Sequence, residues 1–135
     1  MLPIALIKQI AARAAEAAAT IPCPMSIAIV DAGANLVYLE RMDNALIASA
    51  EVAQRKARCA MLYNRPTKAF EDAIAAGRTA LTMLPDILPL EGGVPLIKEG
   101  KVVGAIGASG GTAQQDGAAA TAGAEFLASL VSNSA

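Results

Sequence analysis

A glycine-rich stretch near the end of the chain offers the clearest place for a small ligand. Ser109 is followed by Gly110, Gly111 and Thr112, and the residues after Thr112 have the composition of a helix. The first N–H groups of a helix have no partner within the helix, and they can hold an anion or a polar ligand. We therefore predict that Ser109, Gly110, Gly111 and Thr112 bind the ligand, with the N–H groups of the loop around an oxyanion.

Lys56 is the charged residue whose position most needs an explanation. It belongs to a helix predicted over residues 45–63, whose solvated side consists of Glu51, Gln54, Arg55 and Arg58. Lys56 lies instead at the edge of a face made of small residues. A lysine there snorkels to the surface, pairs with a buried carboxylate or faces a cavity. The three alternatives stay open, and Lys56 is a candidate catalytic residue.

Three further charged residues complete the candidate site. Arg41 ends a predicted strand and could bind a carboxylate through two parallel hydrogen bonds. Glu91 and Asp116 could move protons in a catalytic step. Three of the candidates also have a structural alternative. Arg41 could pair with Asp43, Asp116 could interact favourably with the dipole of the helix in whose first turn it lies, and Ser109 could cap the backbone.

The absence of histidine narrows the chemistry. It removes the commonest metal ligand and general base, and with it every Ser-His and Cys-His pair. Cys23 and Cys59 lie far apart and have no metal-type spacing, so we expect two buried thiols in a reducing compartment. We predict no metal site.

Composition narrows the class of protein further. The chain has 135 residues, of which 55% are hydrophobic, and this is enough for one domain, residues 1–135, with a core of its own. A net charge of −1, two Phe, two Tyr and no Trp argue against a nucleic-acid partner. No apolar run is long enough to span a membrane, and the start does not have the pattern of a secretory signal. We therefore expect a cytoplasmic protein without a membrane partner.

Hydrophobic periodicity and turn residues predict the elements that must position these side chains. Helices are expected at 3–19, 45–63, 68–76 and 113–131, with a helical turn at 79–84. Strands are expected at 25–30, 36–41, 94–98 and 101–108, with a further short strand at 87–90. The two clear strand pairs are hairpins, so the sheet is antiparallel and the fold is α+β.

Six segments of the chain, taken together and in order, resemble the GlcG/HbpS family, which includes the C-terminal domain of PduO-type proteins. They are 29–37 (IVDAGANLV), 41–43 (RMD), 56–58 (KAR), 65–69 (RPTKA), 92–95 (GGVP) and 104–110 (GAIGASG). The resemblance implies a profilin-like fold, with an antiparallel five-stranded sheet flanked by helices. It also implies assembly into homo-oligomers, dimers or larger.

The resemblance and the polar residues together suggest a function. We expect a small-molecule-binding protein or a catabolic enzyme that acts on an organic acid or a related carbonyl compound, by isomerase, hydrolase or lyase chemistry if it is catalytic. The first alternative is a haem-binding or haem-degrading protein, because some family members bind haem. Without histidine, the iron ligand would have to be Thr67, Tyr63, Met61 or Cys59. The second alternative is a structural or chaperone-like oligomer.

Overall fold

Four strands form one antiparallel sheet in the computed structural model, which describes residues 1–132. They are β1 (Ser26–Asp31), β2 (Leu36–Arg41), β3 (Gly93–Lys98) and β4 (Lys101–Ser109), arranged in the order β2-β1-β4-β3. Each hairpin predicted from the sequence forms, and the two hairpins join through β1 and β4. The α+β class and the antiparallel sheet are therefore confirmed.

The fifth strand is absent from the part of the chain that the structure describes. The segment predicted as that strand, 87–90, runs as irregular chain. Pro85 lies just before it and Pro89 within it, and proline cannot donate a ladder hydrogen bond. The expectation of a five-stranded sheet was wrong for this reason.

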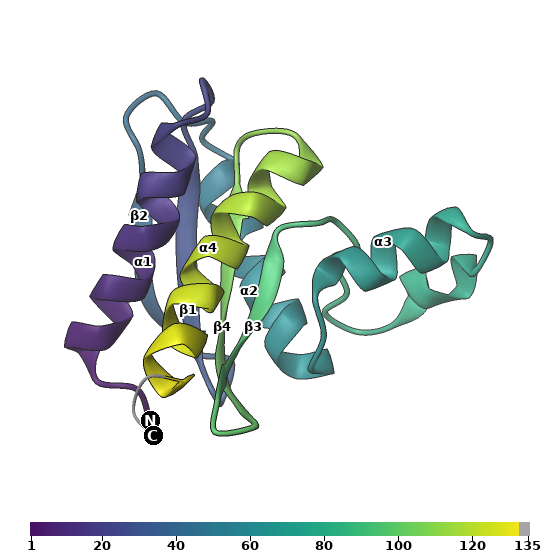
Figure 1. Cartoon of the computed structure of the whole chain (residues 1–135). Helices are drawn as coiled ribbons and strands as arrows, with labels where there is room; N and C mark the ends of the chain where they lie inside the picture. Colours follow the sequence, from purple (N-terminus) through teal and green to yellow (C-terminus); the bar gives the residue numbers. More distant parts are fainter. Residues whose placement is uncertain (133–135) are drawn as a thin grey trace.

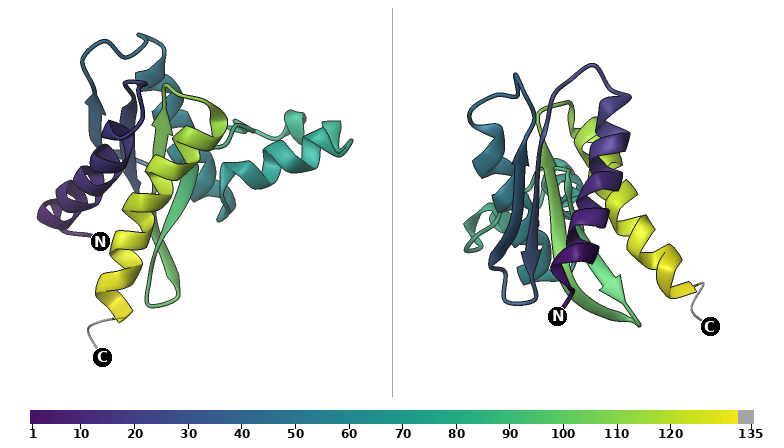
Figure 2. Two further views of the ribbon diagram at one scale, coloured as in Figure 1. Left: turned by 45° about the horizontal axis from the view of Figure 1, so that its top comes forward. Right: turned by 90° about the vertical axis from the view of Figure 1, so that its left-hand side faces the viewer.

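Helices cover both faces of the sheet, as Figures 1 and 2 show. Helices α1 (Ile4–Ala19) and α4 (Ala113–Ser132) lie side by side on one face, and α2 (Ser49–Tyr63) lies on the other. Large side chains fill the layer under α1 and α4, where the buried residues include Ile10, Ile27, Ile29, Leu96, Ile106 and Leu127.

The layer under α2 is much thinner. A Cβ atom at Gly107 would collide with the carbonyl oxygen of Ala53, so the helix backbone rests almost directly on β4. The small-residue face predicted for this helix is thus the face that contacts the sheet. The helix begins at Ser49 and not at residue 45. Residues 45–48 form irregular chain and a turn, in which the Ser49 N–H donates to the Leu46 carbonyl.

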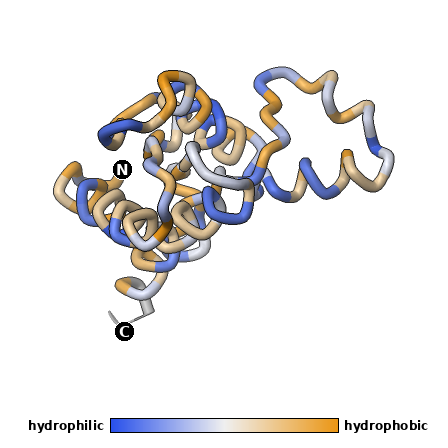
Figure 3. The backbone as a smooth tube through the Cα atoms, turned by 90° about the horizontal axis from the view of Figure 1, so that it is seen from above, coloured by the Kyte–Doolittle hydropathy of each residue, from blue (hydrophilic) through white to orange (hydrophobic). Residues whose placement is uncertain are grey.

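Residues 64–92 form an arm that extends away from the sheet (Figures 1 and 3). It contains α3 (Thr67–Ala75) and the 3₁₀ helix η1 (Thr79–Met83), none of whose residues is buried. Thr67 ties the base of the arm: its Oγ1 donates to the Leu90 carbonyl and accepts from the Gly93 N–H at 2.9 Å. Phe70 is buried there, with its ring against that of Tyr63.

Candidate functional site

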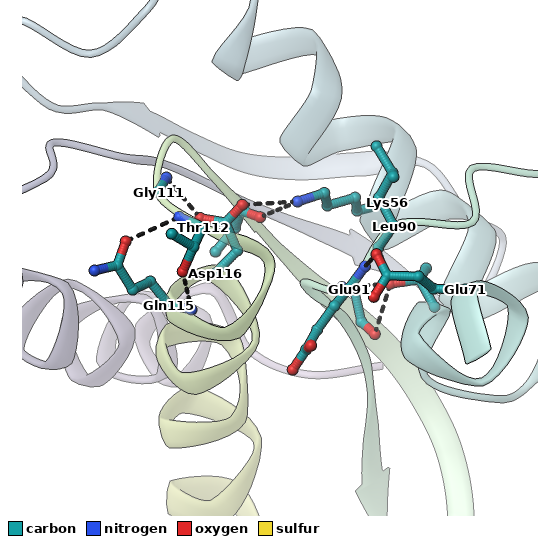
Figure 4. A network of polar contacts seen from close by, with 11 residues as sticks. Lys56, Glu71, Leu90, Glu91, Gly111, Thr112, Gln115 and Asp116 are labelled. Carbon is teal, nitrogen blue, oxygen red and sulfur yellow. Dashed lines mark hydrogen bonds and ion pairs between the residues drawn. The ribbon is translucent and has the colours of Figure 1, made fainter. Parts of the chain in front are cut away.

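Lys56 and Asp116 form a buried ion pair beneath the glycine-rich loop (Figure 4). Nζ of Lys56, from α2, lies 2.9 Å from Oδ2 of Asp116, from the first turn of α4. The two side chains are 3% and 5% exposed. Nζ also donates to the Ala108 carbonyl at 3.1 Å. Of the three alternatives for Lys56, the structure shows pairing with a buried carboxylate.

Two N–H groups of the loop already have acceptors from the protein. Gly111 donates to Oδ1 of Asp116 at 2.8 Å, and Thr112 donates to Oε1 of Gln115 at 2.8 Å. Gln115 N–H in turn donates to Oγ1 of Thr112 at 3.2 Å, which completes a capping box at the start of α4. An external oxyanion at these two N–H groups would have to displace Asp116 and Gln115.

Two glycines flank the ion pair in conformations that other residues rarely adopt. Gly92 has φ 133° and Gly110 has φ 144°. A Cβ atom at Gly92 would meet the Lys56 side chain, and one at Gly110 would meet the Pro24 carbonyl. Glycine at these positions lets β4, α2 and the start of α4 come together around Lys56.

Glu91 and Arg41 lie apart from the ion pair. The Glu91 carboxylate rests against Gly117 of α4 and points away from Lys56 (Figure 4). Its N–H donates to Oε1 of Glu71 at 3.3 Å. Arg41 is exposed on the edge strand β2, and its side chain makes no hydrogen bond or ion pair with any described residue.

Ser109 is buried at the end of β4, next to the loop. Its place in the sheet is opposite Ser26, which is also opposite Arg41, so Ser109 and Arg41 lie two strands apart in one row. The structure therefore brings Lys56, Asp116, Ser109 and the loop together but keeps Arg41 at the edge. A role for any of these residues toward a ligand stays a prediction.

The charge around the loop disfavours a carboxylate ligand. Asp116 neutralises Lys56, while the carboxylates of Glu91 and Glu71 lie close by. Glu91 and Glu71 would repel an organic acid that approached this surface. A site for an organic acid would therefore need a cationic surface elsewhere on the protein.

A polar pocket of about 350 Å³ lies between α2 and the turn that joins β1 to β2. We call it the arginine pocket; it is lined by Val30, Ala34, Asn35, Leu36, Glu51, Gln54, Arg55 and Arg58. Its volume is within the range of small-molecule sites. The lining combines guanidinium, carboxylate and amide groups with an apolar part.

The two arginines of this pocket differ in their contacts. Arg58 donates from Nη1 to the Ala34 carbonyl at 3.2 Å, and its Nε lies 3.7 Å from Oδ1 of Asp86. The side chain of Arg55 makes no hydrogen bond or ion pair with any residue from 1 to 132. Its guanidinium is therefore available to a ligand.

The turn opposite the arginines is held in place by Asp31. Oδ1 of Asp31 accepts from the N–H groups of Gly33 and Asn35, both at 2.9 Å. The sequence pattern placed Arg55 and Arg58 on one side of a helix but assigned that side to solvent. A helical wheel describes one helix and carries no information on the turn that packs opposite it.

Other hollows lie elsewhere on the surface. A more open polar one of about 490 Å³ lies against α1 and α4, lined by Arg13, Glu16, Ala17, Ala122, Glu125, Phe126 and Ser129. An apolar pocket of about 170 Å³ lies between the start of α1 and the sheet, lined mainly by Leu2, Ile4, Ile7, Ile29, Val37 and Val103. Among the described residues, no group of three or more Cys, Asp or Glu could hold a metal ion. No helix within that part of the chain is both long and apolar enough to cross a membrane.

The side chains considered as iron ligands are engaged inside the protein. Cys59 is buried, its Sγ accepts from the Leu88 N–H at 3.5 Å, and burial raises the pKa of the thiol. Thr67 holds the base of the arm, Tyr63 donates to the Pro85 carbonyl, and Met61 packs beside Val30 and Ala60. These four residues do not fit an axial haem ligand in the chain as it stands.

Fold and pockets together define an α+β protein with a four-stranded antiparallel sheet and a polar pocket of small-molecule size. Comparison with known proteins gives the family. Residues 2–125 match the family model described as haem degrading protein HbpS-like, and the chain belongs to this family.

Similar proteins include Protein GlcG of Escherichia coli strain K12, which is 44% identical over 85 residues. That match covers 63% of this chain and 63% of GlcG, less than two thirds of the relative's length. The crystal structure of HbpS superimposes with a TM-score of 0.85 at 34% identity, covering 93% of this chain and 89% of HbpS. A crystal structure of PduOC in complex with heme gives 0.82 at 27% identity, covering 92% and 93%.

Proposed function

We propose that this protein binds a small organic acid in the arginine pocket. The observation that carries the proposal is the Arg55 guanidinium, which lines a polar pocket of about 350 Å³ and has no partner within the described residues. A planar guanidinium binds a carboxylate through two parallel hydrogen bonds. In this proposal Arg55 binds the ligand carboxylate, as was expected of Arg41 from the sequence.

The rest of the lining suits a short acid. Val30, Ala34 and Leu36 offer an apolar surface for a hydrocarbon part, while the amides of Asn35 and Gln54 can bond to a carbonyl oxygen. Gln54 donates one N–H to the Ala50 carbonyl at 3.1 Å and keeps its Oε1 available. A related carbonyl compound with a carboxylate end fits the same arrangement.

Catalysis is a further step of the proposal. Glu91 is half-buried beside the start of α4 and is the candidate for proton transfer, whereas Lys56 and Asp116 are too deeply buried to reach a ligand and act as positioning residues for the loop. Isomerase, hydrolase or lyase chemistry would require a substrate that reaches Glu91. The binding proposal does not depend on it.

Isothermal titration with acetate, butyrate, pyruvate and succinate tests the binding proposal. We expect at least one of them to bind at millimolar concentration or below, and Arg55→Gln to weaken that binding about tenfold, the size of one charge-assisted hydrogen-bonded pair. Arg78→Gln is the matched control, because Arg78 is exposed on the arm and should leave binding unchanged. Absence of binding to the unchanged protein, or equal binding by Arg55→Gln, would refute the proposal.

Haem binding is the second candidate function. What favours it is the similarity to PduOC, whose crystal structure is that of a heme complex. The family to which the chain belongs is also described as haem degrading protein HbpS-like. Against it stand the lack of histidine and the internal contacts of Thr67, Tyr63, Met61 and Cys59.

Titration with hemin separates the two candidates. A shift of the Soret band that saturates near one equivalent would support haem binding, and Cys59→Ser should then leave it unchanged because that thiol is buried. If no shift occurs, the haem alternative falls while the organic-acid proposal stands.

A further inference from the structure

The arginine pocket contains one carboxylate that makes no ion pair, and this limits the ligands it can accept. Glu51 lines the pocket one helical turn before Arg55, yet it forms no ion pair with any described residue. It lies on the same side of α2 as Arg55 and Arg58. A ligand carboxylate held by Arg55 would therefore leave Glu51 facing the remainder of the ligand.

Asp86 adds negative charge at the side of Arg58. Its Oδ1 lies 3.7 Å from Arg58 Nε, so the charge of Arg58 is already matched, and Arg58 also donates to the Ala34 carbonyl. Among the described residues that line the pocket, Arg55 is then the one cation that makes no ion pair. One carboxylate satisfies it, and a second carboxylate would find Glu51 and Asp86 without a further cation.

We infer that the pocket selects short carboxylates with one negative charge and that Glu51 is the specificity-determining residue that rejects dicarboxylates. This inference rests on the proposed function and adds to it the charge of the ligand. The apolar residues Val30, Ala34 and Leu36 match the uncharged end of such a ligand. Glu51 is exposed, so water screens its charge, and repulsion between like charges about 4 Å apart in water is worth about a factor of five in affinity.

Butyrate and succinate are suitable probes, because they have four carbons each and differ by one carboxylate. At low ionic strength, isothermal titration of the unchanged protein should show butyrate binding about fivefold more tightly than succinate. Glu51→Gln should bring the two dissociation constants together or reverse their order. Glu99→Gln is the control, since Glu99 lies at the exposed tip of the β3–β4 hairpin and should preserve the ratio.

The outcomes separate the inference from the function on which it rests. If both acids bind equally to the unchanged protein, or if Glu51→Gln leaves their ratio as it was, selection by Glu51 is refuted while the pocket remains an acid site. If acetate or pyruvate binds but neither butyrate nor succinate does, the inference fails while the proposed function stands. If none of the four acids binds, or if Arg55→Gln binds them unchanged, the proposed function fails and the inference fails with it. Raising the salt concentration should reduce the preference, as expected for a charge effect near the surface.

Discussion

The buried ion pair of Lys56 and Asp116 acts at the scale of single residues. It joins α2, the end of β4 and the start of α4, since Nζ bonds to Asp116 and to the Ala108 carbonyl while Asp116 also accepts from Gly111. Burial of two charges costs desolvation energy, so such a pair fixes geometry more surely than it adds stability.

Removal of one partner should destabilise the protein strongly. Lys56→Met leaves the Asp116 carboxylate buried without a counter-charge, and we expect a loss of about 3–5 kcal/mol in the free energy of unfolding, measured by urea denaturation. The double variant Lys56→Met with Asp116→Leu should lose less than either single change, because no charge remains buried.

An exposed pair provides the control. Lys68 and Asp72 are 2.7 Å apart, but their side chains are 52% and 61% exposed, so Lys68→Met should change stability by less than about 1 kcal/mol. Similar losses in Lys56→Met and Lys68→Met would contradict the structural role of the buried pair.

Tyr38 should ionise at unusually high pH. A hydrogen bond from its hydroxyl to Oε1 of Glu40, at 2.6 Å, and partial burial raise the pKa of Tyr38 from 10.0 to about 12. The folded state thus favours the neutral phenol. This contribution to stability is complete below pH 10 and is lost as the pH rises toward 12.

Phenolate absorbance measured against pH tests this in a Tyr63→Phe background, where Tyr38 is the single tyrosine. Glu40→Gln should move the midpoint down toward the ordinary value for tyrosine, because it removes the negative charge that accepts the hydrogen bond from the Tyr38 hydroxyl. A midpoint near 10 in the presence of Glu40 would refute the hydrogen bond.

Single residues were predicted from the sequence where local geometry decides their role. The capping box of Thr112 and Gln115 needs only residues three positions apart, a pattern that can be recognised in the sequence alone. The role of Lys56 could not be predicted, because its partner Asp116 lies 60 residues further along the chain and no local pattern links the two. Arg55 was assigned to solvent because the turn that packs opposite it comes from a different part of the chain.

At the scale of elements, the contact between α2 and β4 depends on glycine. Gly107→Ala would push a methyl group into the Ala53 carbonyl oxygen and toward the Ala57 N–H. We expect a loss of at least about 2 kcal/mol in the free energy of unfolding, because both neighbours are backbone atoms that cannot rotate away.

Gly100→Ala separates this collision from the ordinary cost of replacing glycine. Gly100 has φ 76° but nothing within 4 Å of an added Cβ, so only backbone strain of about 1 kcal/mol is expected. If the two variants lost equal stability, the close approach of α2 to the sheet would be in doubt.

The hairpins were the most predictable elements, because turn residues and alternating side chains fix each one locally. The strand β2 and the β3–β4 turn at Glu99 and Gly100 lie where the sequence placed them. Segment 87–90 is apolar enough for a strand but runs as irregular chain, because Pro85 before it and Pro89 within it cannot donate ladder hydrogen bonds. Residues 45–48, predicted as the first turn of a helix, form irregular chain and a turn instead.

At the scale of the whole molecule, the arm of residues 64–92 is the part with the least core of its own. Residues 75–80 are all exposed, and exposed apolar side chains such as Met83, at 84%, lie near its end. Limited trypsin digestion of the protein should therefore cut first after Arg78, which can be identified by mass spectrometry.

Protection of Arg78 would have a definite meaning. First cleavage at Lys98 or Lys101, on the exposed tip of the β3–β4 hairpin, would mean that another molecule covers the arm in solution. Assembly with a second copy of the chain would then be the natural explanation. Homo-oligomer formation remains a prediction, and sedimentation analysis of the same sample would measure it.

The pairing of β1 with β4 has a consequence for folding during synthesis on the ribosome. β1 and β2 emerge early as a hairpin, but the other edge of β1 gains its partner only when β4 has been synthesised, more than half the chain later. Until then an apolar strand edge is exposed, which favours wrong pairing between nascent chains. Closure of the sheet is therefore a late, non-local event, and the nascent chain should need chaperone protection until residue 109 has left the exit tunnel.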